Sequence, residues 1–220
     1  MTQKYSNICV KILLSMSKHL QSTDTKIMSC IQENGVGWVF TPAHFHDLGS
    51  RNAVASALKR FKAAGTIRQL ARGIYDYPIQ DPVLGTITPS ADSIAKSLAA
   101  RNAIRLQPSG AYAANIIGLS EQVPVKIILL TDGSTRHVRI GQREIILKHT
   151  TPRNMATAGR KSGIFIQALR YLGKNQVDEK IKSIISRQIK PEDCKQIYND
   201  LQYAPVWIAN ILRPLVQQTA

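Results

Sequence analysis

The sequence predicts an α+β protein, and three observations indicate this class. Apolar residues at helical spacing alternate with short apolar runs that suit strands better than helices. Between Trp38 and Pro78 the segments follow a compact order of helices and a terminal hairpin. Beyond Pro89, strand-like runs are mixed with several helical segments. We therefore expect a small N-terminal domain, followed by a mixed α+β domain with a small antiparallel sheet and C-terminal helices.

Length and composition restrict the classes of protein that this chain can belong to. Its 220 residues suit one or two domains, and 29 Lys and Arg against 14 Asp and Glu give a net charge of +15. Such a field favours nucleic acid, an anionic membrane surface or an acidic protein as partner. The 3 cysteines lack metal-ligand spacing, and no apolar run approaches the ~20 residues of a membrane span. We expect a cytoplasmic protein with reduced thiols.

The first elements are short and well punctuated. Thr25 is placed to cap a helix over residues 26–33, which Asn34 and Gly35 end. A short strand over residues 36–40 follows. Thr41 and Pro42 then begin a second helix, which is brief because Gly49 comes directly after Leu48.

A third helix is expected from Ser50, its N-cap, to Ala64, before Gly65. Its apolar residues fall at i, i+3, i+4 and i+7, which predicts one buried stripe of Val54, Ala57, Leu58 and Phe61. The opposite face is slender, polar and cationic, with Asn52, Ser56, Lys59 and Ala63, and with Arg60 at its edge. Such a face suits a DNA groove, although an ordinary amphipathic surface helix has the same pattern.

The surrounding elements favour DNA. A tight turn at Leu48-Gly49 joins two helices, and two strand-like runs, 66–70 and 74–77, follow the third helix. This order is typical of a winged helix-turn-helix, although some winged helices serve only protein contacts. No acidic residue lies between Arg51 and Arg72. The predicted DNA-binding residues, with two arginines on the wing, are Ser50, Arg51, Asn52, Ser56, Lys59, Arg60, Arg68 and Arg72.

The predicted organisation has four parts: an N-terminal extension over residues 1–24, a winged helix-turn-helix DNA-binding domain over 25–80, a linker over 81–89 and a C-terminal α+β domain over 90–220. In the last part, runs 125–131, 135–140 and 144–149 predict an antiparallel meander, and residues 104–107 a further short strand. Helices are expected at 90–102, 110–117, 164–172, 177–187, 192–201 and 205–212.

A second basic window runs from Arg136 to Lys174, in which Glu144 is the only acidic residue. It predicts a second interaction surface that faces RNA, a protein or more of the DNA, although a charge run is often a solvated face. The residues assigned to it are Arg136, Arg139, Arg143, Lys148, Arg153, Arg160 and Lys161.

We find no pattern typical of an enzyme. The segment Ala158–Gly163 (AGRKSG) lacks the glycine that a phosphate-binding loop needs before its Lys-Ser pair. His44 and His46 stand at i and i+2, so they do not share a helix face as metal ligands would. We therefore expect a protein without catalytic residues, cofactor or metal.

Three stretches resemble a known family. FTPAHFHDLGSRNAVASALKRFKAAGTIRQLARGIYDYP, and then RLQPSGAYAANIIGLSEQVPVKIILLTDG with RHVRIGQREIILKHTTPR, are similar to the AbiEi-type antitoxins of bacterial abortive-infection systems, and in particular to a DUF6088-like subgroup. The resemblance covers roughly Lys26 to Leu212. It implies an N-terminal winged helix that represses its own operon at inverted repeats. It also implies a C-terminal domain that counteracts a nucleotidyltransferase-like toxin in phage defence.

The leading hypothesis is thus a transcriptional autorepressor that binds double-stranded DNA and acts as the antitoxin of an AbiE-like toxin–antitoxin system. The alternative is a regulator without a partner toxin, whose basic C-terminal domain binds RNA or protein. A toxin that modifies tRNA would be opposed by competition for that RNA, so tRNA and the toxin itself are both candidate partners.

Overall fold

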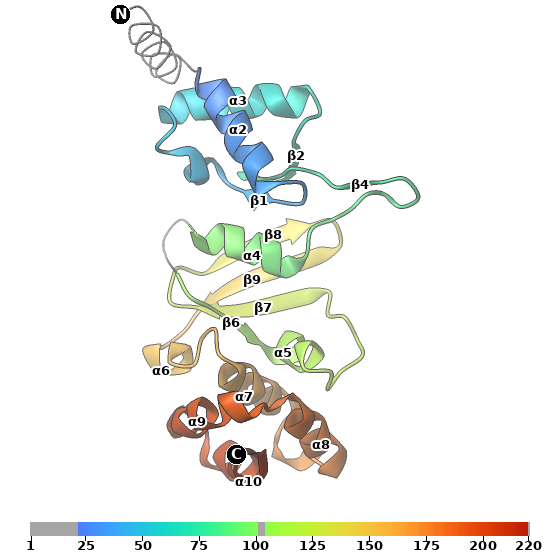
Figure 1. Ribbon diagram of the computed structural model, residues 1–220, viewed down its shortest axis with the longest axis vertical. Coiled ribbons are helices and arrows are strands. Elements are labelled where there is room, and N and C mark those ends of the chain that lie inside the picture. The colour runs from blue at the N-terminus through green and yellow to red at the C-terminus, as the bar shows by residue number, and fades with distance from the viewer. Residues whose placement is uncertain (1–21, 101–103, 220) are drawn as a thin grey trace, which may run out of the picture. The chain divides into compact units, whose positions relative to one another are not determined.

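The computed structural model describes residues 22–100 and 104–219. It divides into two compact units, Met1–Ser93 and Ile94–Ala220, each treated separately below (Figure 1). The predicted N-terminal extension falls, up to residue 21, outside the described residues. Within those residues, no helix is both long and apolar enough to cross a membrane.

The first unit opens with α2 (Thr23–Asn34), which begins earlier than expected. Ser22, and not Thr25, is the N-cap, because its Oγ accepts a hydrogen bond from the Thr25 amide at 3.2 Å. Both residues are suitable caps, so the sequence alone did not separate them. The helix ends at Gly35, whose positive φ of 78° is a backbone conformation that glycine adopts readily.

The second predicted helix is a single 3₁₀ segment, η1 (Pro42–Phe45), rather than an α-helix. Its tight pitch follows from the i→i+3 bond in which the His44 amide donates to the Thr41 carbonyl at 3.0 Å. The Thr41 amide in turn donates to Nδ1 of His44 at 3.1 Å. With so few residues before Gly49, these local bonds replace the longer α-helical ladder.

The third predicted helix is present as α3 (Arg51–Ala63). Ser50 is its N-cap, and Ser50 Oγ accepts from the Ala53 amide at 3.3 Å. Val54, Ala57 and Leu58 are buried as the periodicity predicts, in a core with α2 and η1 that also contains Ile27, Ile31, Phe40, Phe45 and Ile67. Trp38 packs against this core, with its ring centroid 4.8 Å from that of Phe40.

Three short strands complete this unit: β1 (Val39–Phe40), β2 (Arg68–Ala71) and β3 (Ile74–Asp76). They form an antiparallel sheet in the order β1-β3-β2. Gly73 adopts a φ of 73° in the two-residue turn between β2 and β3, as a tight hairpin requires. Helices followed by this small sheet are compatible with a winged helix.

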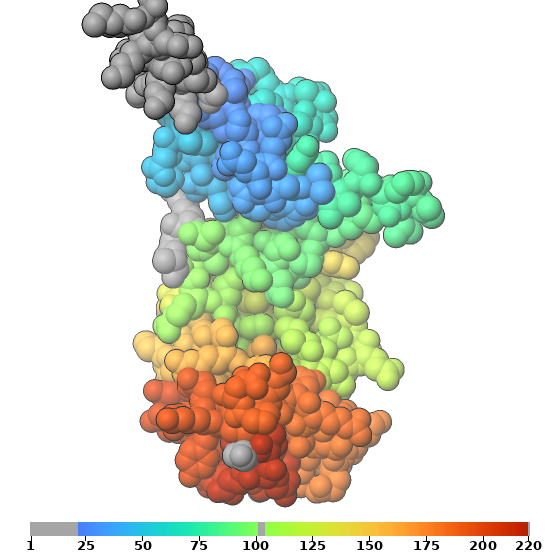
Figure 2. Space-filling model, in the orientation of Figure 1, coloured from blue at the N-terminus to red at the C-terminus, as the bar shows by residue number. Residues whose placement is uncertain are grey.

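The segment predicted to be a linker contains a second hairpin, β4 (Gln80–Asp81) with β5 (Gly85–Thr86). Asp81 closes its turn, because Oδ1 accepts from the amides of Val83 and Leu84, both at 2.8 Å. The hairpin projects from the body of the first unit (Figures 1 and 2). Pro78 and Pro89 flank this hairpin and Pro82 lies in its turn, so the segment is folded rather than an irregular connection.

The sheet of the second unit is mixed, so the predicted antiparallel meander is wrong. Its strands are β6 (Leu106–Ser109), β7 (Lys126–Thr131), β8 (Arg136–Ile140) and β9 (Arg143–His149). Their order is β6-β7-β9-β8, and β9 lies parallel to β7 while β8 stands at the edge. The central place goes to β9, since its Ile145, Ile146 and Leu147 are all buried, whereas β8 carries Arg136 and Arg139, and charged side chains suit an edge.

Helices cover both faces of this sheet. Figure 1 shows α4 (Ala91–Ala100) on one side, and α5 (Gly110–Ile116) with α7 (Lys161–Leu172) on the other. The remaining helices are α6 (Pro152–Met155), η2 (Lys174–Gln176), α8 (Glu179–Gln188), α9 (Pro191–Asp200), η3 (Leu201–Tyr203) and α10 (Val206–Thr219). A core that includes Phe165, Leu169, Ile185, Ile197 and Leu212 joins α7 to α8, α9 and α10.

The contact between α7 and β6 depends on a glycine. A Cβ added at Gly163 would overlap the side-chain oxygen of Gln107 and the backbone oxygen of Thr157. Gln107 is fully buried, and its Oε1 has no hydrogen-bond partner in the described part of the chain. The helix therefore approaches the sheet more closely here than any side chain would allow.

We predict that Gly163→Ala destabilises the protein by about 1–3 kcal/mol through overpacking, although alanine is intrinsically the better helix former by about 1 kcal/mol. Urea denaturation measures the change. Ser183→Ala, at an exposed position of α8, is a control for a gain in helix propensity without overpacking. A more stable Gly163→Ala variant would contradict the packing.

Candidate nucleic-acid interface

The α3 helix presents a polar face outward because its apolar stripe is fixed in the core. Arg51, Asn52, Ser56 and Lys59 are all exposed. Val54, Ala57 and Leu58 are at most 2 % exposed on the opposite side. At 100° per residue, burying one set places the other set in solvent.

The outward side chains of α3 have no partner within the described part of the chain. Within residues 22–100 and 104–219, the side chains of Arg51, Asn52, Ser56 and Lys59 form no hydrogen bond or ion pair. An exposed row of donors and one amide, with no internal partner, is suited to bind an external polyanion. Ser50 differs, because its hydroxyl is used to cap the helix.

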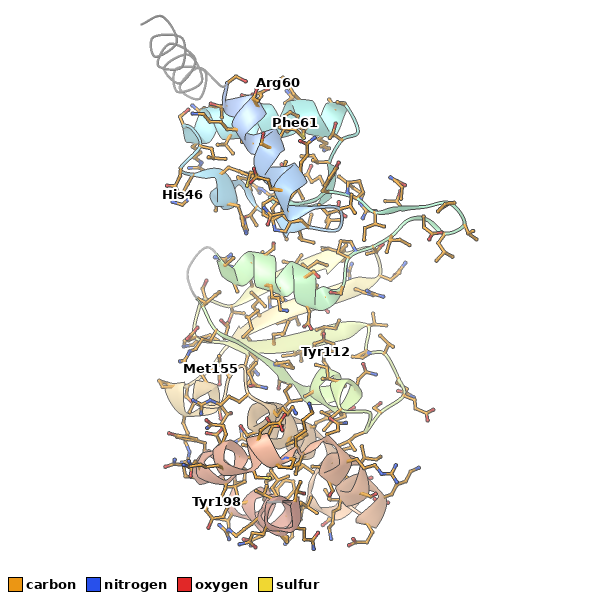
Figure 3. The ribbon with its side chains drawn as sticks, viewed as in Figure 1. His46, Arg60, Phe61, Tyr112, Met155 and Tyr198 are labelled. Carbon is orange, nitrogen blue, oxygen red and sulfur yellow. The ribbon has the colours of Figure 1, made fainter. Side chains whose placement is uncertain are left out.

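Arg60, at the edge of this face, is held by α2. Its Nε and Nη2 donate to the two carboxylate oxygens of Asp24 at 2.8 Å and 2.6 Å, and Figure 3 shows Arg60 beside that helix. The hydrogen bond and the charge of Arg60 lower the pKa of Asp24. Arg60 therefore links α3 to α2, although its side chain is still 59 % exposed.

Arg68 is turned inward rather than toward a wing tip. Its guanidinium forms a bidentate pair with Asp76, at 3.1 Å and 2.6 Å, and also donates to the Ile87 carbonyl at 2.9 Å. The Asp76 side chain is only 1 % exposed. Arg72, in contrast, is exposed at the turn between β2 and β3. Of the two predicted wing arginines, only Arg72 has a guanidinium free to reach a ligand.

Two features of this unit were not anticipated. Lys62 donates to Oε1 of Gln69 at 2.7 Å, which joins the end of α3 to β2. His44 is half-buried rather than a surface histidine, its ring edge-on to Trp38 with centroids 5.6 Å apart. Burial lowers the pKa of His44 because desolvation disfavours the imidazolium. In the described part of the chain, no three His, Cys, Asp or Glu residues are grouped to hold a metal ion.

The residues predicted for a second basic surface do not form one cluster. Directly paired residues share a face of a sheet, so Arg136 and Arg143 lie with Leu147 and Ile140 on one face. Arg139 and Lys148 lie on the opposite face. The sequence could not separate them, because side chains change face at every residue and the strand pairing was unknown.

Two further residues predicted for the second basic surface form salt bridges with aspartates. Arg160 donates to Asp200 at 2.7 Å, and Asp200, buried in α9, also accepts from Ser162. Lys161 donates to Asp193 at 2.5 Å. These partners stand 40 and 32 residues further along the chain, beyond the reach of local pattern analysis. Arg153 remains exposed on α6.

A family model matches residues 26–197 of the chain, and its description is "Family of unknown function (DUF6088)". The chain belongs to the DUF6088 family. This confirms the DUF6088 part of the predicted resemblance, over most of the stretch on which that resemblance was based. No curated protein sequence matches this DUF6088 member significantly.

Among solved structures, the DUF6088 chain is similar to the RV2827C protein from Mycobacterium tuberculosis. The match has 14 % sequence identity and a TM-score of 0.45, and it covers 88 % of this chain and 75 % of the other. We draw no functional conclusion from so distant a likeness.

We predict different consequences for the two arginines of the β2–β3 hairpin. Arg68→Ala should reduce the free energy of unfolding by about 3 kcal/mol, because it leaves the Asp76 carboxylate buried and unpaired. Arg72→Ala, the matched control on the same hairpin, should change it by less than about 0.5 kcal/mol. Urea denaturation of both variants checks this, and equal effects would show that the Arg68–Asp76 pair is not structural.

Proposed function

We propose that this protein is a sequence-specific DNA-binding regulator, and that α3 is its recognition helix in the major groove. The observation that carries the proposal is the outward face of α3, where four exposed polar side chains have no partner within the described residues. The surrounding unit supports it, since a short 3₁₀ segment and turn precede the helix and a small hairpin follows it.

The side chains on α3 and the hairpin divide by chemistry into two roles. Asn52 and Ser56, with Arg51, are suited to base edges, since an amide pairs with adenine and a guanidinium with guanine. Lys59 and Arg72 are suited to phosphates or to the minor groove, both of which attract positively charged side chains.

Arg60 and Arg68 have a different role. Arg60 positions α3 through Asp24, and Arg68 positions the hairpin through Asp76.

We further propose that the regulated promoter is the protein's own, and that the second unit acts as the antitoxin of an AbiE-like system. The support is the family resemblance stated above. Membership of the DUF6088 family supports the resemblance in sequence, but it says nothing about the antitoxin activity, because the function of that family is unknown. The test is genetic: expression of the neighbouring gene alone should arrest growth, and co-expression of this protein should restore it. Unarrested growth would leave the alternative of a regulator without a toxin.

We predict that Lys59→Ala and Asn52→Ala weaken DNA binding in different ways. Loss of a phosphate contact at Lys59 should weaken binding to all sequences and reduce the salt slope, −d log K/d log[salt], by about one. Loss of a base contact at Asn52 should cost about 1–3 kcal/mol on the operator and relax the preference at one position. Fluorescence anisotropy on operator and scrambled duplexes measures both effects.

Lys195→Ala is the control for net charge, because it removes an exposed lysine from α9 in the other unit. It should leave the salt slope unchanged. The proposal for α3 fails if Lys59→Ala behaves like Lys195→Ala, or if Asn52→Ala leaves the base preference intact.

A further inference from the structure

One face of the second unit's sheet is only partly covered. Gln107 and Ser109 of β6 point to this face, where Ser109 donates to Gln167 of α7 at 3.3 Å. The strand register places Lys126, His137, Arg139, Glu144 and Lys148 on the same face. Helix α7 lies over β6, and β8 stands at the far edge of the sheet. On that edge His137, Arg139 and Lys148 are exposed.

A pair of arginines stands beside this open face, where α6 meets α7. Arg170 follows Gly163 and Gln167 at helical spacing, so it projects from the side of α7 that faces the sheet. Its Nη1 donates to Oδ1 of Asn154 at 3.0 Å. The Asn154 amide nitrogen in turn donates to Thr150 Oγ1 at 2.9 Å, which holds the end of α6 in place. Arg153 is the residue next to Asn154.

These two guanidiniums have no carboxylate partner in the described part of the chain. Arg153 is exposed and its side chain forms no hydrogen bond or ion pair there, and the Arg170 guanidinium has only the amide of Asn154. Partial burial and the charge of Arg153 lower the pKa of Arg170. The nearby Arg105 and Arg160, in contrast, each pair with an aspartate, at 2.8 Å and 2.7 Å.

Two like charges held close without a counterion are unfavourable, unless an anion binds between them. Most of the N–H donors of the pair remain free, and planar guanidinium donors match the oxygens of a phosphate group. We propose that Arg153 and Arg170 clamp a phosphate of a nucleic-acid backbone, which continues across the open sheet face past Lys148 toward Arg139. This site is separate from α3 and does not depend on the proposed function.

The length of the face argues for a polymer rather than a free phosphate ion. Arg139 of β8 stands directly beside Glu144 of β9, and Lys148 lies four residues further along β9. At about 3.3 Å per residue, Arg139 and Lys148 are therefore about 13 Å apart along the strand direction. A strand of duplex carries a phosphate about every 3.4 Å along its axis, so the cations span several phosphates. Glu144 adds less repulsion than a lone carboxylate would, since the ammonium group of Lys126 lies 3.9 Å from its carboxylate.

The same face carries no Phe, Tyr or Trp on β7, β8 or β9. Strong base stacking on a large aromatic ring is therefore not available on these strands, and binding should depend mainly on the backbone and little on the sequence. The chemistry is that of a phosphodiester backbone, which both RNA and DNA supply.

The test uses the full-length protein at 50 mM salt, with two fluorescent probes: a single-stranded RNA and a duplex DNA of arbitrary sequence. Arg153→Gln/Arg170→Gln should weaken binding to at least one probe roughly tenfold or more, and reduce its salt slope by about 1.4 on RNA or 1.8 on duplex. The probe that loses more identifies the polymer. Lys59→Ala, on α3, should not change the RNA result.

Arg136→Gln/Arg143→Gln is the matched control, since it removes the same charge from the opposite face of the same sheet. It should weaken binding by no more than about twofold. The proposal is overturned if the two double variants have equal effects, because net charge alone then explains them, or if Arg153→Gln/Arg170→Gln binds both probes like the wild type.

Circular dichroism shows whether Arg153→Gln/Arg170→Gln folds. If it does not, the single variant Arg153→Gln at an exposed position is used instead, and it should reduce the salt slope by about 0.7 on RNA.

Discussion

Burial of the apolar stripe of α3 is the constraint on which the first unit depends. Val54, Ala57 and Leu58 pack with α2, η1 and β1 in one core, and each large buried side chain contributes roughly 1.5–3 kcal/mol. Because a helix is rigid, this packing also decides which residues face solvent. The stability of the unit and the composition of its outward face are thus set by the same interaction.

The basic side chains of both units fall into two groups, those paired with a carboxylate and those without a carboxylate partner in the described residues. Asp24, Asp76, Asp132 and Asp200 each bind one arginine and so fix a helix, a hairpin or a loop. A second group has no carboxylate partner within the described residues: Arg51 and Lys59 on α3, Arg72 at the β2–β3 turn, Arg153 on α6 and Arg170 on α7. The chain has 29 basic residues and 14 acidic ones, so many cations have no carboxylate partner, and those on α3, at the β2–β3 turn, on α6 and on α7 lie at the surfaces that we propose as interfaces.

The sequence predicted the features that depend on local chemistry. Ser50 caps α3 and three of its four expected stripe residues are buried, with Phe61 partly buried, because capping and helical periodicity involve only neighbours. Prediction from the sequence failed for features that depend on partners far along the chain. The parallel pairing of β7 with β9 required knowing that β8 occupies the edge. Arg68, Arg160 and Lys161 looked available, although their carboxylates lie 8, 40 and 32 residues away. Arg170 was missed because only the fold brings it to Arg153.

The most direct test of the central claim is a hydroxyl-radical footprint of the full-length protein on the DNA upstream of its own gene. An α3 helix that reads the major groove at inverted repeats predicts protected half-sites whose centres lie about 10 base pairs, or a multiple of that spacing, apart. Protection should disappear with Asn52→Ala and Lys59→Ala combined. Uniform protection without half-sites, or a footprint that survives that double change, would contradict the account.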